Sequence, residues 1–149
     1  MATITTTLVM EHAIFGTVFD QIERVLPGLN SVPEIRVLAS VVEGLLAGHA
    51  ETETNLAYAA LDHVLAEKGK LDRLHRDHKE IDDNFKRVHN AGSLAEAQLL
   101  LKKALAASRD HFRYEERVVF PLLERVLASE TLGDLGEAAL RQYPVIPLR

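Results

Sequence analysis

Hydrophobic residues recur along the chain at intervals of three and four, the spacing that places side chains on one face of an α-helix. This pattern predicts four long helices, at about residues 7–26, 31 to 62–68, 70–90 and 93–128, and no segment is typical of a β-strand. A shorter helix, at about residues 132–142, is predicted before the terminal segment YPVIPLR. Four long helices with short connections favour an all-α fold, an up-down-up-down four-helix bundle with a short C-terminal helix and tail.

Helix-capping motifs and prolines set the expected ends of these helices. The segments SVPE, at residues 31–34, and SLAE, at residues 93–96, have the capping-box pattern that starts a helix. Pro121 lacks a backbone N–H group, so it predicts a kink in the fourth helix. The second helix is predicted to break near Asp62 or to overhang the bundle. The reason is that His49 lies far from the end of this helix, whereas His78 lies close to the start of the third helix.

The second and fourth predicted helices carry the same motif. HAETETNLAYAALDHVL, from His49, aligns without gaps with HFRYEERVVFPLLERVL, from His111. Glu53 then falls on Glu115, and most of the apolar positions around these pairs also coincide. A histidine and a glutamate one turn apart therefore occur twice on the same apolar frame.

The first and third helices also resemble each other. EHAIFGTVFDQI, at residues 11–22, aligns with DHKEIDDNFKRV, at residues 77–88, and places His12 on His78. The chain is thus a tandem pair of helical hairpins, and each hairpin has a histidine on its first helix and the His-xxx-Glu motif on its second.

Five histidines and two glutamates lie on helix faces whose neighbouring positions are mainly apolar, so these side chains are predicted to point into the core. A single core histidine is usually a hydrogen-bonded structural residue, and a metal-free bundle is the simplest alternative. Burying so many ionisable groups is costly, however, unless they are paired or bound to metal. The candidate metal ligands are His12, His49, Glu53, His75, His78, His111 and Glu115.

Imidazole and carboxylate ligands without sulfur suit iron, manganese or zinc. Seven ligands exceed what one ion normally takes, but they suit two ions that share bridging carboxylates. Glu53 and Glu115 come from equivalent places in the repeat, so they are the natural bridges. Such a site leaves room for an oxo or hydroxo bridge and an open position, where a redox-active pair could bind dioxygen or peroxide; zinc offers no redox chemistry.

On the motifs EHAIF, HAETE, DHKEI and HFRYEERVVFP, in that order, the chain resembles the hemerythrin-like, or HHE cation-binding, family over about residues 8–128. The resemblance implies a four-helix bundle around a non-haem di-iron centre. It also implies bridges at Glu53 and Glu115 and terminal ligands at His12, His49, His78 and His111. In hemerythrins proper the third helix supplies two histidines, and His75 would be the second here.

Two spacings depart from hemerythrins proper. His75 and His78 are three residues apart, where hemerythrins proper have four. The spacing from His111 to its carboxylate is four if Glu115 is the ligand, as in many bacterial members, whereas the spacing of five in hemerythrins proper would select Glu116. These departures leave the full ligand set, and simple reversible oxygen carriage, as open questions.

Other polar and aromatic residues near the motifs are not predicted to be ligands. Glu11 and Asp77, each next to a ligand histidine, are expected either to orient imidazoles or to be surface charges. Tyr58 and Phe120, which are equivalent in the repeat, are expected to pack at the end of the bundle. His89 is expected to be exposed.

Length and composition fit one globular domain, since the 149 residues are 47% hydrophobic and 26% charged. We expect a single hemerythrin-like domain over residues 1–149, with the bundle at about 7–128 and a C-terminal extension at 129–149. The net charge of −5 argues against nucleic-acid binding, and the absence of cysteine excludes disulfides and thiol chemistry. No apolar run approaches about 18 residues and no signal peptide is evident, so we expect no membrane span and a cytoplasmic location.

Together these features predict a metal-binding protein with two iron ions that binds dioxygen or another small diatomic or peroxide ligand, in oxygen or redox sensing, storage, or oxidative-stress and iron handling. Two alternatives remain open: an iron-dependent regulatory or interaction module, and a peroxide-decomposing di-iron enzyme. No general acid or base stands clearly outside the candidate ligands, which weighs against a dedicated enzyme, so no catalytic residue is assigned.

Overall fold

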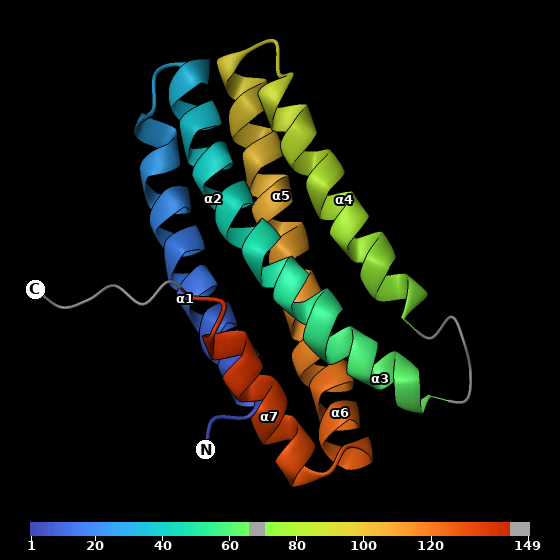
Figure 1. The fold of residues 1–149 in the computed structure, drawn as a ribbon. Helices are drawn as coiled ribbons and strands as arrows, with labels where there is room; N and C mark the ends of the chain where they lie inside the picture. Colours follow the sequence, from blue (N-terminus) through green and yellow to red (C-terminus); the bar gives the residue numbers. More distant parts are fainter. Residues whose placement is uncertain (66–70, 144–149) are drawn as a thin grey trace, which may run out of the picture.

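The computed structural model describes residues 1–65 and 71–143 and confirms an all-α bundle (Figure 1). Two hairpins lie side by side, and the second helix of each runs on through a π-helical segment, η2 or η3, into a short helix. No strand occurs in the described residues. The elements are α1 (Ile4–Val25), η1 (Leu26–Gly28), α2 (Val32–Thr52), η2 (Glu53–Tyr58), α3 (Ala59–Val64), α4 (Asp72–His89), α5 (Leu94–Tyr114), η3 (Glu115–Val119), α6 (Phe120–Val126) and α7 (Ser129–Leu140).

Both predicted capping motifs start helices. The Ser31 hydroxyl accepts a hydrogen bond from the backbone of Glu34, and Ser93 caps α5 in the same way. The first helix begins earlier than predicted because Thr3 forms a further capping box with Thr6. The predicted helix end at residues 66–68, the predicted start at residue 70 and the tail from residue 144 lie outside the described residues.

The second helix overhangs the beginning of α4, which is one of the two alternatives predicted, and α3 runs past Asp62 to Val64. In Figure 1, α2, η2 and α3 form one continuous rod that extends past the beginning of α4, and α3 contacts α6 at the far end. The fourth helix loses its regular α-helical pattern just before Pro121, as expected, but proline is not the sole cause. The equivalent residue in the first hairpin is Ala59, and the same π-helical segment precedes it.

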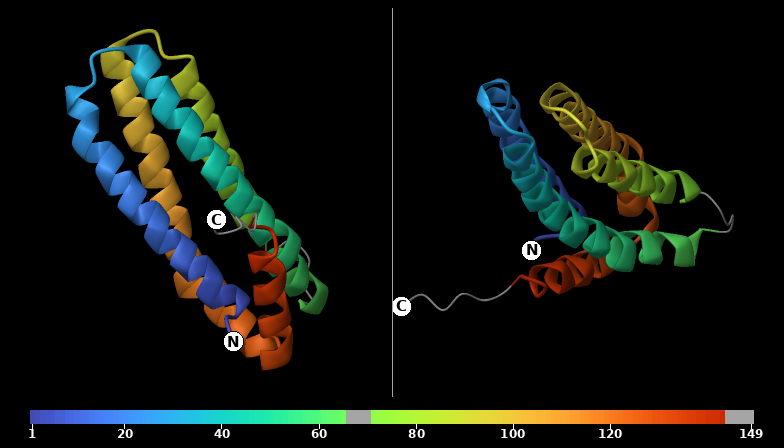
Figure 2. Two further views of the ribbon diagram at one scale, coloured as in Figure 1. Left: turned by 60° about the vertical axis from the view of Figure 1, so that its left-hand side comes forward. Right: turned by 90° about the horizontal axis from the view of Figure 1, so that it is seen from above.

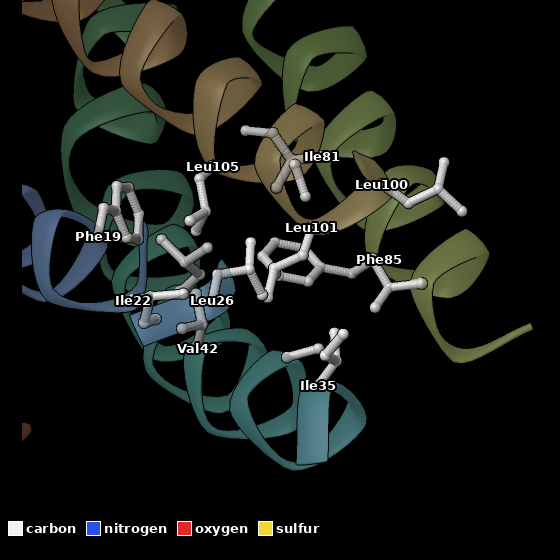
Figure 3. Packing of buried hydrophobic residues seen from close by; sticks show 14 of the residues in the cluster. Phe19, Ile22, Leu26, Ile35, Val42, Ile81, Phe85, Leu100, Leu101 and Leu105 are labelled. Atoms are coloured by element: carbon white, nitrogen blue, oxygen red, sulfur yellow. The ribbon is translucent and has the colours of Figure 1, made fainter. Parts of the chain in front are cut away.

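Two apolar clusters fill the interior. The larger lies toward the hairpin turns and joins all four long helices, and its fully buried members include Phe19, Ile35, Phe85 and Leu101, one from each helix (Figure 3). The smaller lies at the opposite end, among residues of α1, η2, α3, α4, η3, α6 and α7. Full burial stabilises the fold by about 1.5–3 kcal/mol for each large apolar side chain. The polar candidate ligands lie between these two dry regions.

The C-terminal helix α7 belongs to the packed fold and starts earlier than predicted, at Ser129. It lies against the start of α1 and against η2 (Figure 2), and Leu132 and Ala139 enter the smaller apolar cluster. No helix within residues 1–65 and 71–143 is long and apolar enough to cross a membrane.

Gly136 allows α7 to approach the N-terminal backbone closely, because a Cβ atom there would collide with the carbonyl oxygen of Ala2. Gly136→Ala should therefore lower the free energy of unfolding, by about 1–3 kcal/mol, as overpacked sites do. Gly16→Ala is the matched control, since a Cβ there meets no atom within 4 Å. The control should raise stability by up to about 1 kcal/mol through helix propensity. Urea unfolding of both variants measures the difference, and equal stabilities would contradict this packing.

Candidate metal centre

The interior between the two apolar clusters contains six of the seven predicted ligands. They form two overlapping groups, and in each group the possible ligand atoms lie within 4.8 Å of one another. Both glutamates are fully buried, three histidines are at most 5% exposed, and the fourth, His78, is half-buried. One group contains Glu53, His78, His111 and Glu115; the other contains His12, His49 and Glu53.

The carboxylate of Glu53 links the two groups. Its Oε1 atom lies 2.7 Å from Nε2 of His49 and 3.5 Å from Nε2 of His12. Its Oε2 atom lies 3.1 Å from Nε2 of His78 and 3.9 Å from Nε2 of His111. Each oxygen therefore faces one histidine pair, as a carboxylate that bridges two metal ions would.

Glu115 repeats this arrangement from the opposite hairpin. Its Oε1 atom is in close contact with Nε2 of His111, and its Oε2 atom lies 3.8 Å from Nε2 of His12. Within the part of the chain that the structure describes, Oε1 of Glu53 and Oε2 of Glu115 are buried oxygens without a hydrogen-bond partner. A buried carboxylate oxygen without a donor is costly, and a cation would compensate for it.

Carboxylates outside the cluster orient three of the imidazoles. Nδ1 of His12 lies 2.9 Å from Glu116, and Nδ1 of His111 lies 3.2 Å from Asp77. Nδ1 of His49 hydrogen-bonds to Glu11. Metal-ligating histidines commonly donate the second N–H group to such a partner.

Glu11 and Asp77 therefore orient imidazoles, which is one of the two roles expected of them. Glu116 is exposed, and its carboxylate contacts His12 from outside the cluster. The structure thus places Glu115, rather than Glu116, among the converging side chains.

The orientation of the imidazole rings directs the Nε2 atoms of the histidines toward the two glutamates, so the centre contains mostly hydrogen-bond acceptors. With Nδ1 as the donor, Nε2 of each neutral imidazole presents a lone pair. Nε2 of His12 lies 3.0 Å from Nε2 of His49, and Nε2 of His78 lies 2.8 Å from Nε2 of His111. Lone pairs at this separation repel each other unless a proton or a metal cation lies between them. The donor set therefore fits metal ions.

The net effect of burial and neighbouring charges is to raise the pKa of Glu115 and to lower the pKa of Glu53. Burial raises the pKa of Glu115, and the negative charge of Glu53 raises it further, to about 8. Burial also acts to raise the pKa of Glu53, but the positive charge of His49 and the close contacts with the other histidines outweigh it. The pKa of Glu53 is therefore well below its usual range, so Glu53 is the carboxylate that remains ionised.

Two histidines hold protons more strongly than usual. Burial lowers the pKa of His49, but the charge of Glu53 and the hydrogen bond to Glu11 outweigh it and raise the pKa to about 9. Burial likewise opposes protonation of His111, yet hydrogen bonds to Glu115 and Glu53 raise its pKa to about 10. Without metal, this centre therefore carries protons at neutral pH in the place that cations would take.

Metal binding should release these protons. The raised pKa values mean that His49, His111 and Glu115 are protonated below about pH 8–10 in the metal-free fold, whereas ligation requires the unprotonated forms. Zn²⁺ affinity should therefore fall by at least about tenfold per pH unit from pH 8 to pH 6. Calorimetry at pH 7, in two buffers of different ionisation enthalpy, counts the protons. A pH-independent affinity without proton release would contradict this site.

The π-helical segments explain how each second helix presents its glutamate and the residue five positions later. In η2 the backbone N–H of Ala59 donates to the carbonyl of Thr54, and in η3 that of Phe120 donates to Glu115, both five residues back. Residues five apart share a face in a π-helix but not in an α-helix. Such single-turn π segments often occur at functional sites.

Tyr58 packs in the smaller apolar cluster at one end of the bundle, as expected, and the π-helical geometry also brings its hydroxyl to the candidate ligands. Its hydroxyl donates to Glu115 at 3.0 Å and lies 3.3 Å from Oε2 of Glu53 and 3.4 Å from Nε2 of His78. Burial and both carboxylates raise the pKa of Tyr58. The equivalent Phe120 stacks over His12, with ring centroids 5.5 Å apart. In both halves of the repeat an aromatic residue follows the glutamate by five positions. This spacing indicates a shared helix face only if the segment is π-helical.

His75 does not join either group. It is exposed, so the prediction that it points into the core is wrong. The buried face of α4 contains Leu71, Leu74 and Ile81, with His78 between them, and His75 follows Leu74 directly. His75 lies on the side of His78 away from Leu74 and Ile81, so its side chain is outside the core, and its ring meets the edge of Tyr58 at a centroid distance of 6.0 Å.

His89 is half-buried rather than exposed. Its Nε2 atom pairs with Glu43 and joins α4 to α2. This pair lies outside the two ligand groups.

Comparison with protein families gives one finding. The hemerythrin HHE cation-binding domain model matches residues 3–123 and, in a second overlapping match, residues 69–137. The second match begins just before the second hairpin, in agreement with the internal repeat. No curated protein and no solved structure matches the chain.

Proposed function

The chain belongs to the hemerythrin HHE cation-binding family, and we propose that it is a non-haem di-iron protein that binds dioxygen or a related small ligand. The observation that carries this proposal is the position of the Glu53 carboxylate, whose two oxygens face two separate histidine pairs. One buried carboxylate between two imidazole pairs suits two ions better than one. The imidazole and carboxylate donors suit iron.

Each ion would have its own histidine pair and one oxygen from each glutamate. His12 and His49 would hold one ion with Oε1 of Glu53 and Oε2 of Glu115. The other ion would take the second pair, His78 and His111, with the remaining two oxygens. Iron held in this way supplies reversible redox chemistry and positions open to a small ligand.

The surroundings would hold this site rigid and largely dry. Apolar clusters close both ends of the interior, and carboxylates fix the imidazole orientations from outside. A pocket of about 250 Å³ reaches Glu53, His78 and His111 between α2 and α4. This volume is at or below the lower end of pockets that enclose drug-sized molecules, which supports a small ligand.

Tyr58→Phe should weaken metal binding without unfolding the protein. Loss of the hydroxyl removes the hydrogen bond to Glu115 while the ring still fills its buried position. Removal of such an outer partner typically costs about 10- to 100-fold in metal affinity. Tyr114→Phe is the matched control, since Tyr114 is half-buried and stacks with Arg73 instead. Competition titration with a chelator measures both variants, and equal affinities would contradict a role for Tyr58 at the centre.

The proposed function is tested with protein loaded anaerobically with ferrous iron and then exposed to dioxygen. New absorption in the near-ultraviolet and visible range, absent from metal-free protein, supports the proposal, and no spectral change contradicts it. Recovery of the ferrous spectrum on removing dioxygen identifies a carrier. Oxygen evolution from peroxide that is lost in His111→Ala identifies the peroxide-decomposing enzyme. Iron-dependent partner binding without either reaction identifies an interaction module.

A further inference from the structure

The pocket between α2 and α4 is the opening through which a small ligand can reach the candidate centre. It extends to Glu53, His78 and His111, and His78 is the most exposed of the six converging side chains, at 17%. Ala47 and Ala50 on α2 have small side chains, which leaves this seam open. We call it the α2–α4 pocket.

The walls of the α2–α4 pocket are mainly apolar, and its one exposed charged side chain is Asp82. Asp82 lies one turn beyond His78 on the same face of α4. Among the residues that the structure describes, no lysine or arginine lines this pocket, and none forms an ion pair with Asp82. An approaching anion therefore meets an uncompensated negative charge next to the opening.

We propose that Asp82 makes the α2–α4 pocket selective for neutral small ligands over small anions. This inference rests on the proposed function, because it names the class of ligand that the same site admits. Dioxygen, nitric oxide and hydrogen peroxide carry no charge and pass Asp82 without electrostatic cost. Azide, nitrite or superoxide carries a negative charge and is repelled by Asp82 at the opening.

Asp83 provides a matched control on the same helix. It is the next residue, it does not line the α2–α4 pocket, and its carboxylate is 2.6 Å from Nζ of Lys79. Asp82→Asn and Asp83→Asn change the net charge of the protein equally. A difference in azide affinity between the two variants therefore depends on where the charge lies and not on the net charge of the protein.

The test is azide binding to protein loaded with iron and oxidised to the ferric form, followed by the visible azide-to-iron absorption band. Asp82→Asn should bind azide about three- to tenfold more tightly than the wild type, the size expected for one nearby, partly screened charge. Asp82→Lys should bind azide more tightly still, and Asp83→Asn should stay within about twofold of the wild type. Raising the salt concentration should narrow these differences. Nitric oxide binding to the ferrous form should be the same in all four proteins.

Equal azide affinity in Asp82→Asn and the wild type overturns the inference and leaves the proposed function intact. Equal tightening in Asp82→Asn and Asp83→Asn also overturns it, because net charge alone would then explain the effect. Parallel gains in azide and nitric oxide binding overturn it too, since steric opening of the pocket would explain both. No azide band in any of the four iron-loaded proteins, Asp82→Lys included, overturns the proposed function and this inference with it.

Discussion

Glu53→Gln should abolish tight binding of both metal ions, although it changes a single side chain. The two oxygens of Glu53 face different histidine pairs, so the loss of its charge and of one acceptor affects both positions. Because loss of an outer hydrogen-bond partner already costs about 10- to 100-fold, loss of this bridging ligand should cost more than about a hundredfold at each position. Competition with a coloured chelator measures both affinities.

The control for this variant is Glu51→Gln, which makes the same chemical change two residues earlier. Glu51 is exposed and lies outside both ligand groups, so its substitution should leave both affinities unchanged. Retention of one tight ion in Glu53→Gln would mean that Glu53 is a terminal ligand rather than a bridge. Circular dichroism confirms in each case that the helices are intact.

Metal loading should raise the unfolding temperature by about 15–30 °C. Each ion that binds only the folded state contributes about 4 kcal/mol when its free concentration is a thousand times the dissociation constant. For a chain of this size, 1 kcal/mol shifts the midpoint by about 2–4 °C. The ions also neutralise the buried carboxylate oxygens of Glu53 and Glu115 that have no hydrogen-bond donor.

This shift is measured by calorimetry with and without a chelator, using Zn²⁺ to avoid oxidation. In the double variant Glu53→Gln/Glu115→Gln the chelator should have little effect, because the ions no longer bind tightly. An unfolding temperature that does not respond to metal in the wild type would support the alternative of a metal-free bundle with hydrogen-bonded histidines.

Periodicity and capping were enough to predict the fold, since each depends on residues close together in the sequence. The SVPE and SLAE motifs start α2 and α5 as expected, and the overhang of α3 followed from the distance between polar residues and helix ends. The docking of α7 on α1 could not be predicted in this way. It depends on the close approach of Gly136 to Ala2, a contact between distant parts of the chain.

The candidate site was predicted where side chains follow α-helical geometry and was missed where they do not. Six of the converging residues were identified by spacings of four and by the repeat. His75 was misplaced because it lies on the side of His78 away from Leu74 and Ile81, beyond the edge of the buried face of α4. Tyr58 was missed because α-helical geometry places it on another face than Glu53, and only the π-helical hydrogen bonding of η2 brings the two together.

The same limitation applied to the partners that orient the imidazoles. Glu116 is exposed, and its carboxylate also reaches across from η3 to His12 on α1. Such a contact between two helices depends on their separation and rotation, which spacing within one helix does not determine.

The most direct test of the two-ion centre is the iron content of protein reconstituted anaerobically with ferrous iron and freed of unbound metal. We predict about two irons per chain in the wild type and almost none in Glu53→Ala/Glu115→Ala, with the helical content of both proteins unchanged. One iron or less per chain in the wild type, or equal iron in the double variant, would contradict a centre bridged by these two glutamates.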